Sequence, residues 1–418
     1  MSNPLPCEPR VRKVDVLIVG GGPSGLAAAC ELRRLGASVV VLERDVEPGG
    51  IARHSDHLGY GLRDLHRVMR GPAYARAWTA RADRAGVDLR VRSTATGWVE
   101  TDDGLGLHVT APTGREEVRA RTILLATGCR ERPRSARLVP GSRPSGVFTT
   151  GSLQQLVHLQ GGRVVRRAVV VGAEHVSYSA VMTIAHAGGV TVAMVTEQPR
   201  TATYAGADRA ARLHYRFPLL CESKVVEILG RNRVSGVRVR NLRTGAESEH
   251  PCDAVIFTGS WVPDHELARQ GGVPLARGFR GPAVDDAGRT DRAGVFAAGN
   301  VLHGALTADA CALEGRHVAM AMHQHLSGRA WPTGGVTVVA ELPLAWVSPN
   351  RITSAVGVKG LVAGVAGAPQ GALVLRQGAR ELWVSRRQHW VEGRLAHVAG
   401  RYLRDLDPMS GPLHLAIS

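Results

Sequence analysis

Long apolar runs are missing from this sequence. No stretch reaches the roughly 20 unbroken apolar residues that a bilayer-spanning helix needs, because Gly, Pro or a charge such as that of Lys359 interrupts the best candidates. The leader Met1–Lys13 is polar and has no apolar core followed by a cleavage site, so it does not resemble a secretory signal. We therefore expect no integral membrane contact and a cytoplasmic location.

Lysine is almost absent. Only Lys13, Lys224 and Lys359 occur among the 52 basic residues, so the formal charge of +16 comes from arginines scattered through every segment. A nucleic-acid-binding surface needs its positive charge gathered on one face to neutralise phosphates. The scattered pattern indicates no nucleic-acid partner and leaves room for acidic partners or anionic substrates.

The six cysteines include no C-x-x-C pair. Cysteines at that spacing mark redox-active disulfides, zinc ribbons and iron–sulfur sites, so the sequence predicts none of these and no metal. Reduced thiols in a packed interior are the expected state of all six.

The sequence does contain a complete βαβ unit near its beginning. An apolar run ends in a glycine cluster, an Ala- and Leu-rich helix stops at Gly36, and a second apolar run ends at Glu43. Their expected ranges are 14–25, 26–35 and 38–43. The whole has the length of about thirty residues that such a unit needs.

Gly20, Gly22 and Gly25 in this unit fit the pattern G-x-G-x-x-G. The first glycine permits the tight turn, the second lets the backbone approach a pyrophosphate, and the third lets the helix pack on the strand. The amides at the helix N-terminus then face the phosphates. Glu43 ends the second strand, where its carboxylate can accept hydrogen bonds from a ribose, so the unit predicts a dinucleotide site.

A second unit of the same order lies in the middle of the chain. Its strand, helix and strand are expected at 167–172, 176–187 and 190–197. Its glycine positions hold Gly172, Glu174 and Ser177. Glu174 would block the close approach of a backbone and set a carboxylate against a pyrophosphate, so NAD(P) binding is doubtful. Two interpretations stay open: a weak site or one for another nucleotide, with Glu197 on its ribose, or a scaffold for subunit contact.

Other segments have a β-type pattern. Hairpins are expected at 86–100 with 105–111 and at 224–229 with 234–239. From about Trp331, short β-type runs at 336–340, 372–375, 381–385 and 412–417 alternate with Gly and Pro. This tail predicts a separate, small β-rich domain.

Two more apolar strands decide which dinucleotide is bound. One ends in Ala126-Thr127-Gly128 and the other in Gly299-Asn300. With these motifs the chain resembles, over about residues 14–326, the two-dinucleotide-fold flavoproteins of the pyridine nucleotide-disulfide oxidoreductase superfamily. In that superfamily both segments pass the FAD dinucleotide and its ribityl chain. The resemblance therefore implies FAD as the cofactor.

Asn300 departs from the superfamily pattern, in which an Asp usually hydrogen-bonds the ribityl hydroxyls. An amide both donates and accepts, so the implied FAD is not put in doubt. A helix is expected at 310–326, and by the geometry of the resembling proteins it points its positive end at the flavin ring. Thr307 and Ala308 are the residues expected nearest that ring.

A closer resemblance rests on four further segments, at 49–62, 70–74, 128–133 and 139–148. They are similar to the FAD-containing subunits of heteromeric dehydrogenases, the opine oxidase, hydrogen cyanide synthase and dye-linked proline dehydrogenase group, with a related subunit beside glycerol-3-phosphate dehydrogenase-like proteins. This resemblance implies a small-molecule substrate and a second, substrate-oxidising flavoprotein subunit as partner.

The implied cofactor contacts come from all of these motifs. They are Gly20, Gly22, Pro23, Ser24, Gly25, Glu43, Arg44, Gly50, Ile51, Ala95, Ala126, Thr127, Gly128, Gly299, Asn300, Thr307 and Ala308. The sequence names no catalytic base. His54, His57, His303 and Thr307 are the candidates for a catalytic role, and each histidine can equally be structural.

The expected fold is α/β: a flavoprotein with two Rossmann-like dinucleotide-binding domains and a small β-rich C-terminal domain. The FAD-binding domain is expected at 1–150 and 251–330, a degenerate NAD(P)-binding-like domain at 151–250, and the β-rich domain at 331–418. The expected function is FAD-dependent dehydrogenation in a heteromeric amine, amino-acid or hydroxy-acid dehydrogenase. A self-sufficient NAD(P)H-dependent flavin reductase and a non-catalytic electron-transfer or scaffold subunit are the alternatives.

Overall fold

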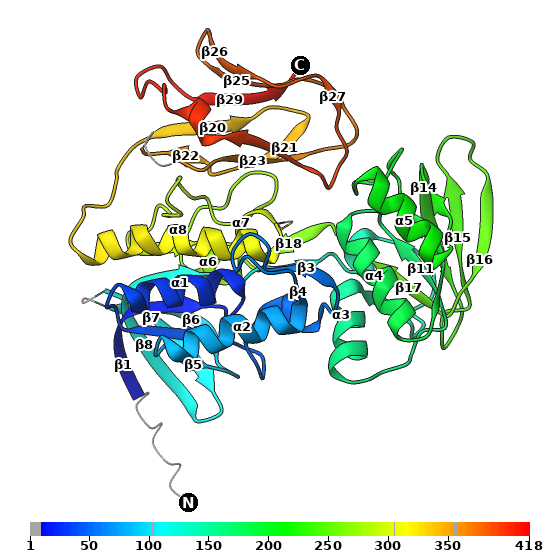
Figure 1. Ribbon diagram of the computed structural model, residues 1–418, viewed down its shortest axis with the longest axis horizontal. Helices are drawn as coiled ribbons and strands as arrows, with labels where there is room; N and C mark the ends of the chain where they lie inside the picture. The colour runs from blue at the N-terminus through cyan, green and yellow to red at the C-terminus, as the bar shows by residue number, and fades with distance from the viewer. Residues whose placement is uncertain (1–9, 102–103, 305, 355–357) are drawn as a thin grey trace, which may run out of the picture.

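The computed structural model of the 418-residue chain describes residues 10–101, 104–304, 306–354 and 358–418. Most of the expected leader with Cys7, the expected turn at 102–103 and Ala305 lie outside the described residues. The described chain forms three lobes (Figure 1): a first lobe (10–146 and 258–330), a second lobe beside it (147–257) and a C-terminal lobe (331–418).

A seven-stranded sheet forms the centre of the first lobe, in the order β5-β2-β1-β8-β7-β6, and β19 pairs with the last residues of β8, beyond the part of β8 that pairs with β7. The sheet therefore takes a strand from beyond the second lobe. Val16, Leu17 and Ile18 are fully buried, as the uninterrupted apolar run of a parallel strand covered on both faces predicts. The strands are β1 (Arg10–Val19), β2 (Val39–Leu42), β5 (Asp88–Arg90), β6 (Thr94–Thr101), β7 (Gly104–Ala111), β8 (Gly114–Leu125) and β19 (Val295–Ala297).

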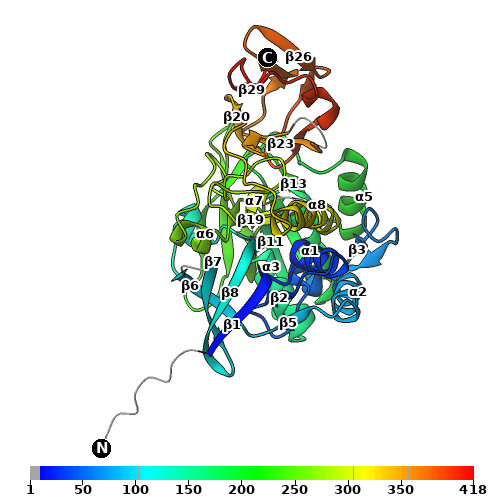
Figure 2. The same ribbon diagram turned by 90° about the vertical axis from the view of Figure 1, so that its left-hand side faces the viewer.

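Helices α1 (Pro23–Arg34), α2 (Gly71–Arg84) and α8 (Ala308–Leu326) pack on one side of this sheet (Figure 2). Gly315 makes the close crossing of α8 over α1 possible, because a Cβ there would lie 2.1 Å from the carbonyl oxygen of Ser24. Short elements complete the lobe: η1 (Gly50–His54), β3 (Leu58–Tyr60), β4 (Met69–Arg70), β9 (Cys129–Glu131), η2 (Arg134–Arg137), β18 (Trp261–Pro263), α6 (Glu266–Gln270) and α7 (Asn300–His303).

The second lobe is built on a parallel sheet in the order β10-β17-β11-β12-β13. Its strands β10 and β17 lie on either side of the predicted 151–250 interval. A three-stranded antiparallel sheet, β14-β15-β16, packs beside it. The elements are β10 (Val147–Thr149), α3 (Thr150–Gln154), η3 (Gln155–Leu159), β11 (Arg167–Val171), α4 (His175–His186), β12 (Val190–Val195), α5 (Ala205–Tyr215), β13 (Leu219–Leu220), β14 (Ser223–Leu229), β15 (Gly236–Asn241), β16 (Glu247–Pro251) and β17 (Ala254–Phe257).

The C-terminal lobe is β-rich and sits above α7 and α8 (Figure 1). Two sheets, β22-β20-β29-β25-β26 and β21-β23-β28, enclose one apolar core that also holds Trp390. The elements are β20 (Val336–Ala340), β21 (Leu344–Ser348), β22 (Arg351–Ile352), β23 (Gly360–Val365), β24 (Gln370–Gly371), β25 (Leu373–Gln377), β26 (Arg380–Val384), β27 (Gln388–His389), β28 (Leu395–Ala399), η4 (Gly400–Leu403) and β29 (Leu413–Ile417).

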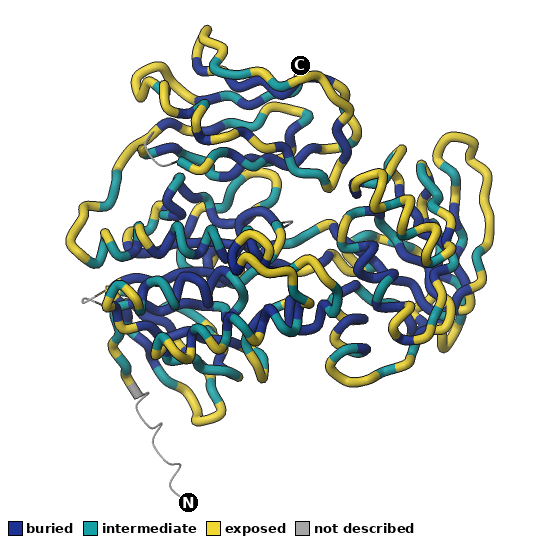
Figure 3. Tube along the Cα trace, viewed as in Figure 1, coloured by how far each residue is buried: buried dark blue, intermediate teal, exposed yellow. Residues whose placement is uncertain are grey.

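The buried residues gather in the sheets of the three lobes, whereas the outer loops are exposed (Figure 3). This architecture confirms the predicted α/β fold class with a small β-rich C-terminal part. None of the helices in the described ranges is long and apolar enough to cross a membrane.

Candidate functional site

A cavity of about 1050 Å³ opens at the carboxyl ends of β1, β2 and β8. Its walls come from all three lobes, including Gly20 of the first, His175 of the second and Trp346 of the third. Ligands of open α/β sheets bind at this end of the strands. Every predicted cofactor contact except Gly25 lines this cavity, and so do the candidates His54, His57 and His303.

The N-terminus of α1 is open toward the cavity. Among the described residues, no side chain caps it, and a Cβ on its N-cap Gly22 would meet no atom within 4 Å. Ser24 Oγ is buried without a hydrogen-bond partner in the described chain. Free helix amides beside an unpartnered hydroxyl form a site for a phosphate group. These residues therefore fit the pyrophosphate of FAD.

Gly20 and Gly25 make the turn before α1 possible. Gly20 has φ +112°, and a Cβ there would lie 2.3 Å from the carbonyl oxygen of Ala126. A Cβ on Gly25 would lie 2.0 Å from the carbonyl oxygen of Gly20. Any side chain at either position would push α1 away from the sheet. Gly25 therefore allows the close packing of α1 on β1.

Glu43 follows β2 on the cavity wall. Its carboxylate accepts hydrogen bonds from the backbone amides of Gly21 at 3.0 Å and Asp45 at 2.9 Å. These bonds fix the carboxylate and leave lone pairs for ribose hydroxyls. The neighbouring Arg44 is exposed and pairs with Asp264 at 3.3 Å.

Asn300 has a local role that an aspartate could not fill. Its Nδ2 donates to the carbonyl oxygen of Leu306 at 3.1 Å, and its Oδ1 accepts from the amide of Leu306 at 3.0 Å. A carboxylate has no hydrogen to donate to the carbonyl. The amide ties α7 to Leu306 and keeps one N–H and one lone pair for the ribityl chain of FAD.

A histidine–carboxylate pair lies on the wall formed by α7 and α8. His303 Nε2 lies 3.1 Å from Glu314 Oε1, and the amide of Gly299 donates to Glu314 Oε2 at 2.5 Å. Desolvation by itself would raise the pKa of Glu314, but the charge and hydrogen bond of His303 and the Gly299 amide hold it below its usual value. Glu314 thus stays ionised and orients His303, whose Nδ1 is buried without a partner in the described chain.

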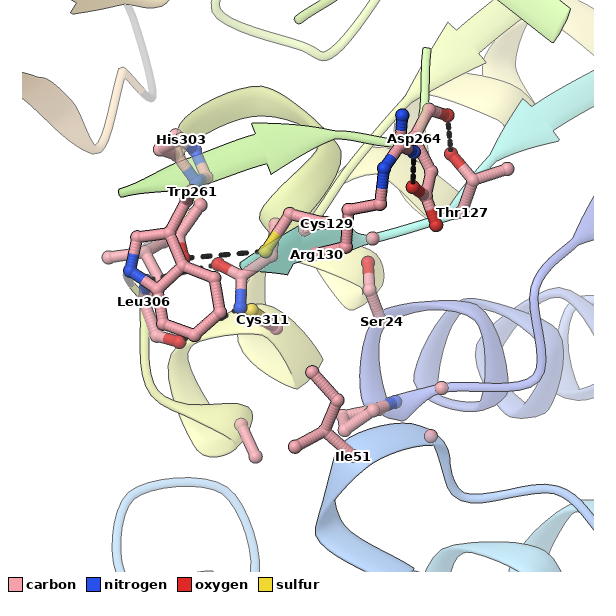
Figure 4. Close-up of a pocket in the computed structure, with 18 of the residues that line it drawn as sticks. Ser24, Ile51, Thr127, Cys129, Arg130, Trp261, Asp264, His303, Leu306 and Cys311 are labelled. Atoms are coloured by element: carbon pink, nitrogen blue, oxygen red, sulfur yellow. Dashed lines mark hydrogen bonds and ion pairs between the residues drawn. The ribbon is translucent and has the colours of Figure 1, made fainter. Parts of the chain in front are cut away.

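Aromatic side chains line the cavity next to this pair. Trp261, Phe279 and Trp346 are all in its wall. The rings of Phe279 and Trp346 are 5.8 Å apart, and those of His303 and Trp346 are 6.4 Å apart. Figure 4 shows the Trp261 ring beside Cys129 and below His303. An apolar chamber with one oriented histidine suits a small organic molecule with a single polar reacting group.

The other candidates have weaker environments for proton transfer. His57 Nδ1 lies 2.8 Å from the carbonyl oxygen of Leu58 at the rim of the cavity. Burial, assisted by the charge of Arg53, lowers the pKa of His54 to about 4, so this ring is neutral near pH 7. The Thr307 hydroxyl donates to Asp309. Burial raises the pKa of Cys129, which makes it a poor nucleophile.

The matching turn of the second lobe is closed by its own side chain. Glu174 is the N-cap of α4 and forms a capping box with Ser177. Its Oε2 accepts hydrogen bonds from Ser177 Oγ at 3.0 Å and Thr258 Oγ1 at 3.1 Å. Desolvation raises the pKa of Glu174. The Glu174 carboxylate thus occupies the N-terminus of α4, whereas the corresponding N-terminus of α1 is open.

A loop of the C-terminal lobe covers this turn from outside. Arg394 donates to the carbonyl oxygen of Ala202 from Nε at 3.1 Å and from a terminal nitrogen at 3.0 Å, and to that of Thr203 at 3.2 Å. A Cβ on Gly393 would lie 2.9 Å from Glu174 Cγ, so the loop backbone packs directly on the cap. The residues of this turn do not fit the pyrophosphate of NAD(P).

Comparison with known proteins decides the family. The family model described as pyridine nucleotide-disulphide oxidoreductase matches residues 14–324. The chain belongs to this family. It is an FAD-dependent oxidoreductase, which confirms the enzyme class and the FAD cofactor that the sequence predicted.

Relatives of this oxidoreductase include subunits of larger enzymes. An opine oxidase subunit of Rhizobium meliloti is 28% identical over 345 residues, covering 73% of this chain and 62% of that protein. The alpha subunit of sarcosine oxidase from Corynebacterium sp. (strain P-1) is 32% identical over 279 residues, covering 61% of this chain and 27% of that protein. The chain thus spans less than two thirds of the length of these relatives. Their names confirm the resemblance to FAD subunits of this group.

A solved structure has the same fold. Thioredoxin reductase of T. acidophilum superposes with a TM-score of 0.64 at 22% identity, covering 75% of this chain and 99% of that one. This likeness shows that the fold of three quarters of the chain is that of a solved structure.

Sequence reasoning missed several site residues of this oxidoreductase. Glu314 lies within an expected helix, and no spacing links it to His303 across the intervening loop. Trp346 and Arg394 reach the site from the separate β-rich tail, so only the packing of that lobe brings them there. Asp264 follows a strand that pairs with Cys129–Glu131, and this pairing between distant segments has no local signal in the sequence.

Proposed function

We propose that this oxidoreductase is the FAD-containing subunit of a heteromeric dehydrogenase that oxidises a small amine, amino acid or hydroxy acid. The observation that carries the proposal is the closed turn around Glu174, because it occupies the place where the pyrophosphate of NAD(P)H would bind. The subunit names of the similar opine and sarcosine oxidases support a partner. The proposed partner is a second flavoprotein subunit.

The side chains on the cavity wall suit dehydrogenation. FAD, when bound, accepts or releases the electron pair. The open end of α1 would hold its pyrophosphate and Glu43 its ribose, while the N-terminus of α8 behind Thr307 lies where negative charge on the ring would be stabilised. Loss of a hydride from a carbon bearing an amine or hydroxyl must be matched by loss of a proton from that nitrogen or oxygen. His303, oriented by Glu314, is the group in the chamber that would accept this proton.

The test is the visible spectrum of the purified chain, recorded without oxygen before and after NADH and NADPH are added. We expect flavin absorbance that persists with both nucleotides. Prompt bleaching by either would show a working nicotinamide site and overturn the proposal in favour of a self-sufficient reductase. If the chain is refolded in the presence of FAD and binds no flavin, the assignment of FAD as its cofactor is overturned.

The remaining alternative is a non-catalytic subunit that only relays electrons. It differs from the proposed function because it does not need His303 to accept a proton from the substrate. In complex with its partner subunit, a His303→Asn variant should lower the rate of flavin reduction by substrate at least about tenfold, because general base catalysis contributes on the order of 10²–10⁴. Thr96, on the outer hairpin of the first sheet, provides a Thr96→Ala control. A relay that receives only electrons would leave the His303→Asn rate unchanged.

A further inference from the structure

The segment 51–70 exposes an unusual set of apolar side chains beside the cavity. Leu58 is 62% exposed, Leu62 58% and Val68 59%. Scattered single apolar residues need no explanation on a protein surface, whereas a group of them marks an interaction site. We call these three residues, with Arg63 and Arg67, the hairpin surface.

The hairpin surface is held firmly. Strands β3 and β4 pair with each other, with Leu58 opposite Arg70. Between them, the buried carboxylate of Asp64 accepts hydrogen bonds from Tyr74 Oη at 2.6 Å and Trp78 Nε1 at 2.9 Å. These bonds attach the turn between β3 and β4 to α2. The backbone of the turn is therefore fixed, and it holds the apolar side chains of the turn in exposed positions.

The charge of the hairpin surface has one sign. Arg63 and Arg67 are exposed, and Arg70 is exposed and pairs with Asp56 at 3.3 Å. The carboxylate within the turn, that of Asp64, is buried below the surface. A partner that covers the leucines must therefore bring negative charge to the arginines.

The hairpin surface continues into the cavity wall. Ile51, His57 and Tyr60 line the cavity as well as belonging to this segment. Figure 4 shows Ile51 at the edge of the pocket, and Figure 2 shows β3 projecting from the body of the first lobe. The amide of Arg63 donates to Asp309 Oδ2 at 3.3 Å, so a protein seated here would lie beside the start of α8, where Thr307 and Ala308 line the cavity. We call this side of the cavity its entrance.

We propose that the hairpin surface docks the acidic face of a protein electron carrier, which exchanges electrons with the FAD through this entrance. The inference deepens the proposed function, since it says where electrons enter or leave the subunit. Redox encounters have small interfaces, and opposite charge speeds their association. Two one-electron carriers are oxidised for each FAD reduced to FADH2, with two protons taken from solvent, and the reverse process balances likewise.

The probe is a plant-type ferredoxin, a small acidic one-electron carrier. We would measure the affinity of the oxidised form for the FAD-loaded chain by calorimetry at low salt, and the rate at which the reduced form bleaches the flavin without oxygen. Both should weaken as salt rises, because exposed charges are screened within about 10 Å at 0.1 M. An Arg63→Glu/Arg67→Glu variant should lose at least about tenfold in both, and a Leu58→Ser/Leu62→Ser variant several-fold.

Matched controls lie on the far turn between β15 and β16, where Leu242 and Arg243 are also exposed. Leu242→Ser and Arg243→Glu should leave the affinity and the rate unchanged. Thermal unfolding of each variant shows whether the chain stays folded. Equal losses in the control and hairpin variants, or no binding of ferredoxin by the wild type, would overturn the proposal.

Two other occupants would also overturn it. Sedimentation would show a dimer that Leu58→Ser/Leu62→Ser converts to monomer if a second copy of the chain covers the hairpin. Flotation with phosphatidylglycerol vesicles, abolished in both hairpin variants, would show a lipid surface. The outcome is separate from the test of the proposed function: bleaching by NADPH would refute that function, while the comparison of hairpin and control variants would still report on the surface.

Discussion

The two dinucleotide units of this chain share one backbone plan and differ in what occupies the start of the helix. In the first, α1 begins at an open Gly22 with an unpartnered Ser24 hydroxyl. In the second, α4 begins at Glu174, whose carboxylate caps the helix and is itself covered by the loop around Arg394. A helix N-terminus needs a hydrogen-bond acceptor from some source. The first unit leaves this position open, whereas the second supplies the acceptor from its own chain.

The difference teaches that a Rossmann-like fold by itself does not establish nucleotide binding. Both units keep the strand, the turn glycine and the helix, and Gly172 has φ +127° where Gly20 has φ +112°. They differ at the second position of the motif, Gly22 against Glu174, and at the third, Gly25 against Ser177, and the two residues of the second unit form its capping box. Single substitutions there and nearby can therefore break the comparison.

The largest effect should come from Gly22→Glu, which copies the second unit into the first. The Cβ has free space, so the chain should fold, but the carboxylate would take the place and repel the charge of the pyrophosphate. We expect FAD affinity to fall at least about 100-fold, measured by flavin fluorescence on refilling the apoprotein. Gly206→Glu on α5 is the control, since its Cβ also meets nothing within 4 Å. Full flavin content in Gly22→Glu would contradict the comparison.

The seam between the two units should weaken in acid. His54 of η1 lies against Gln154 of α3, and burial lowers its pKa from 6.5 to about 4. Between those values the unfolded chain binds more protons than the folded one, so stability falls as pH falls through this window, by roughly 3 kcal/mol in all.

The measurement is denaturant unfolding of wild type and His54→Asn at pH 7 and pH 4.5. The stability difference between the two pH values should shrink by about 2 kcal/mol in the variant. His389→Asn, at an exposed ring, should behave like the wild type. An unchanged difference in His54→Asn would show that this ring does not carry the effect.

A paired experiment compares the two helix starts directly. Glu174→Ala should destabilise the ligand-free chain by about 1–2 kcal/mol, because it uncaps α4 and removes the hydrogen bonds that the Ser177 and Thr258 hydroxyls donate to the carboxylate. Ser24→Ala should leave that stability unchanged and weaken FAD binding about fivefold to tenfold, since its hydroxyl finds a partner only in a ligand. The same loss of stability in both variants would refute the distinction.

The smallest effect is expected from Arg394→Ala. It removes the hydrogen bonds to Ala202 and Thr203 at a partly exposed site and should cost about 1 kcal/mol. Hydrogen exchange should rise at 392–395 and 201–203 only. Arg386→Ala, at an exposed arginine of the same lobe, is the control. NADH should still fail to bleach the flavin, because Glu174 remains in place. Bleaching would show that the loop around Arg394, and not Glu174, closes the nucleotide turn of the second lobe.

Local patterns predicted much of the first unit. The glycine spacing, the apolar strands and Glu43 each depend on neighbours within about thirty residues, so their geometry follows from local chain conformation. Glu174 could be recognised as unfit for a pyrophosphate for the same reason. The full extent of the parallel sheet in the second lobe could not be predicted from the sequence. Strands β10 and β17 join this sheet from either side of the expected interval 151–250, and their pairing has no local signal.

The sequence by itself determined the family, the α/β fold and FAD as cofactor, because these rest on short-range motifs whose residue types have few other uses. Only the tertiary structure decided that Glu314 orients His303, that Trp346 closes the chamber and that the loop around Arg394 covers the second turn. These contacts join residues of different helices or different lobes. They depend on how packed surfaces meet, and no periodicity within one segment records that.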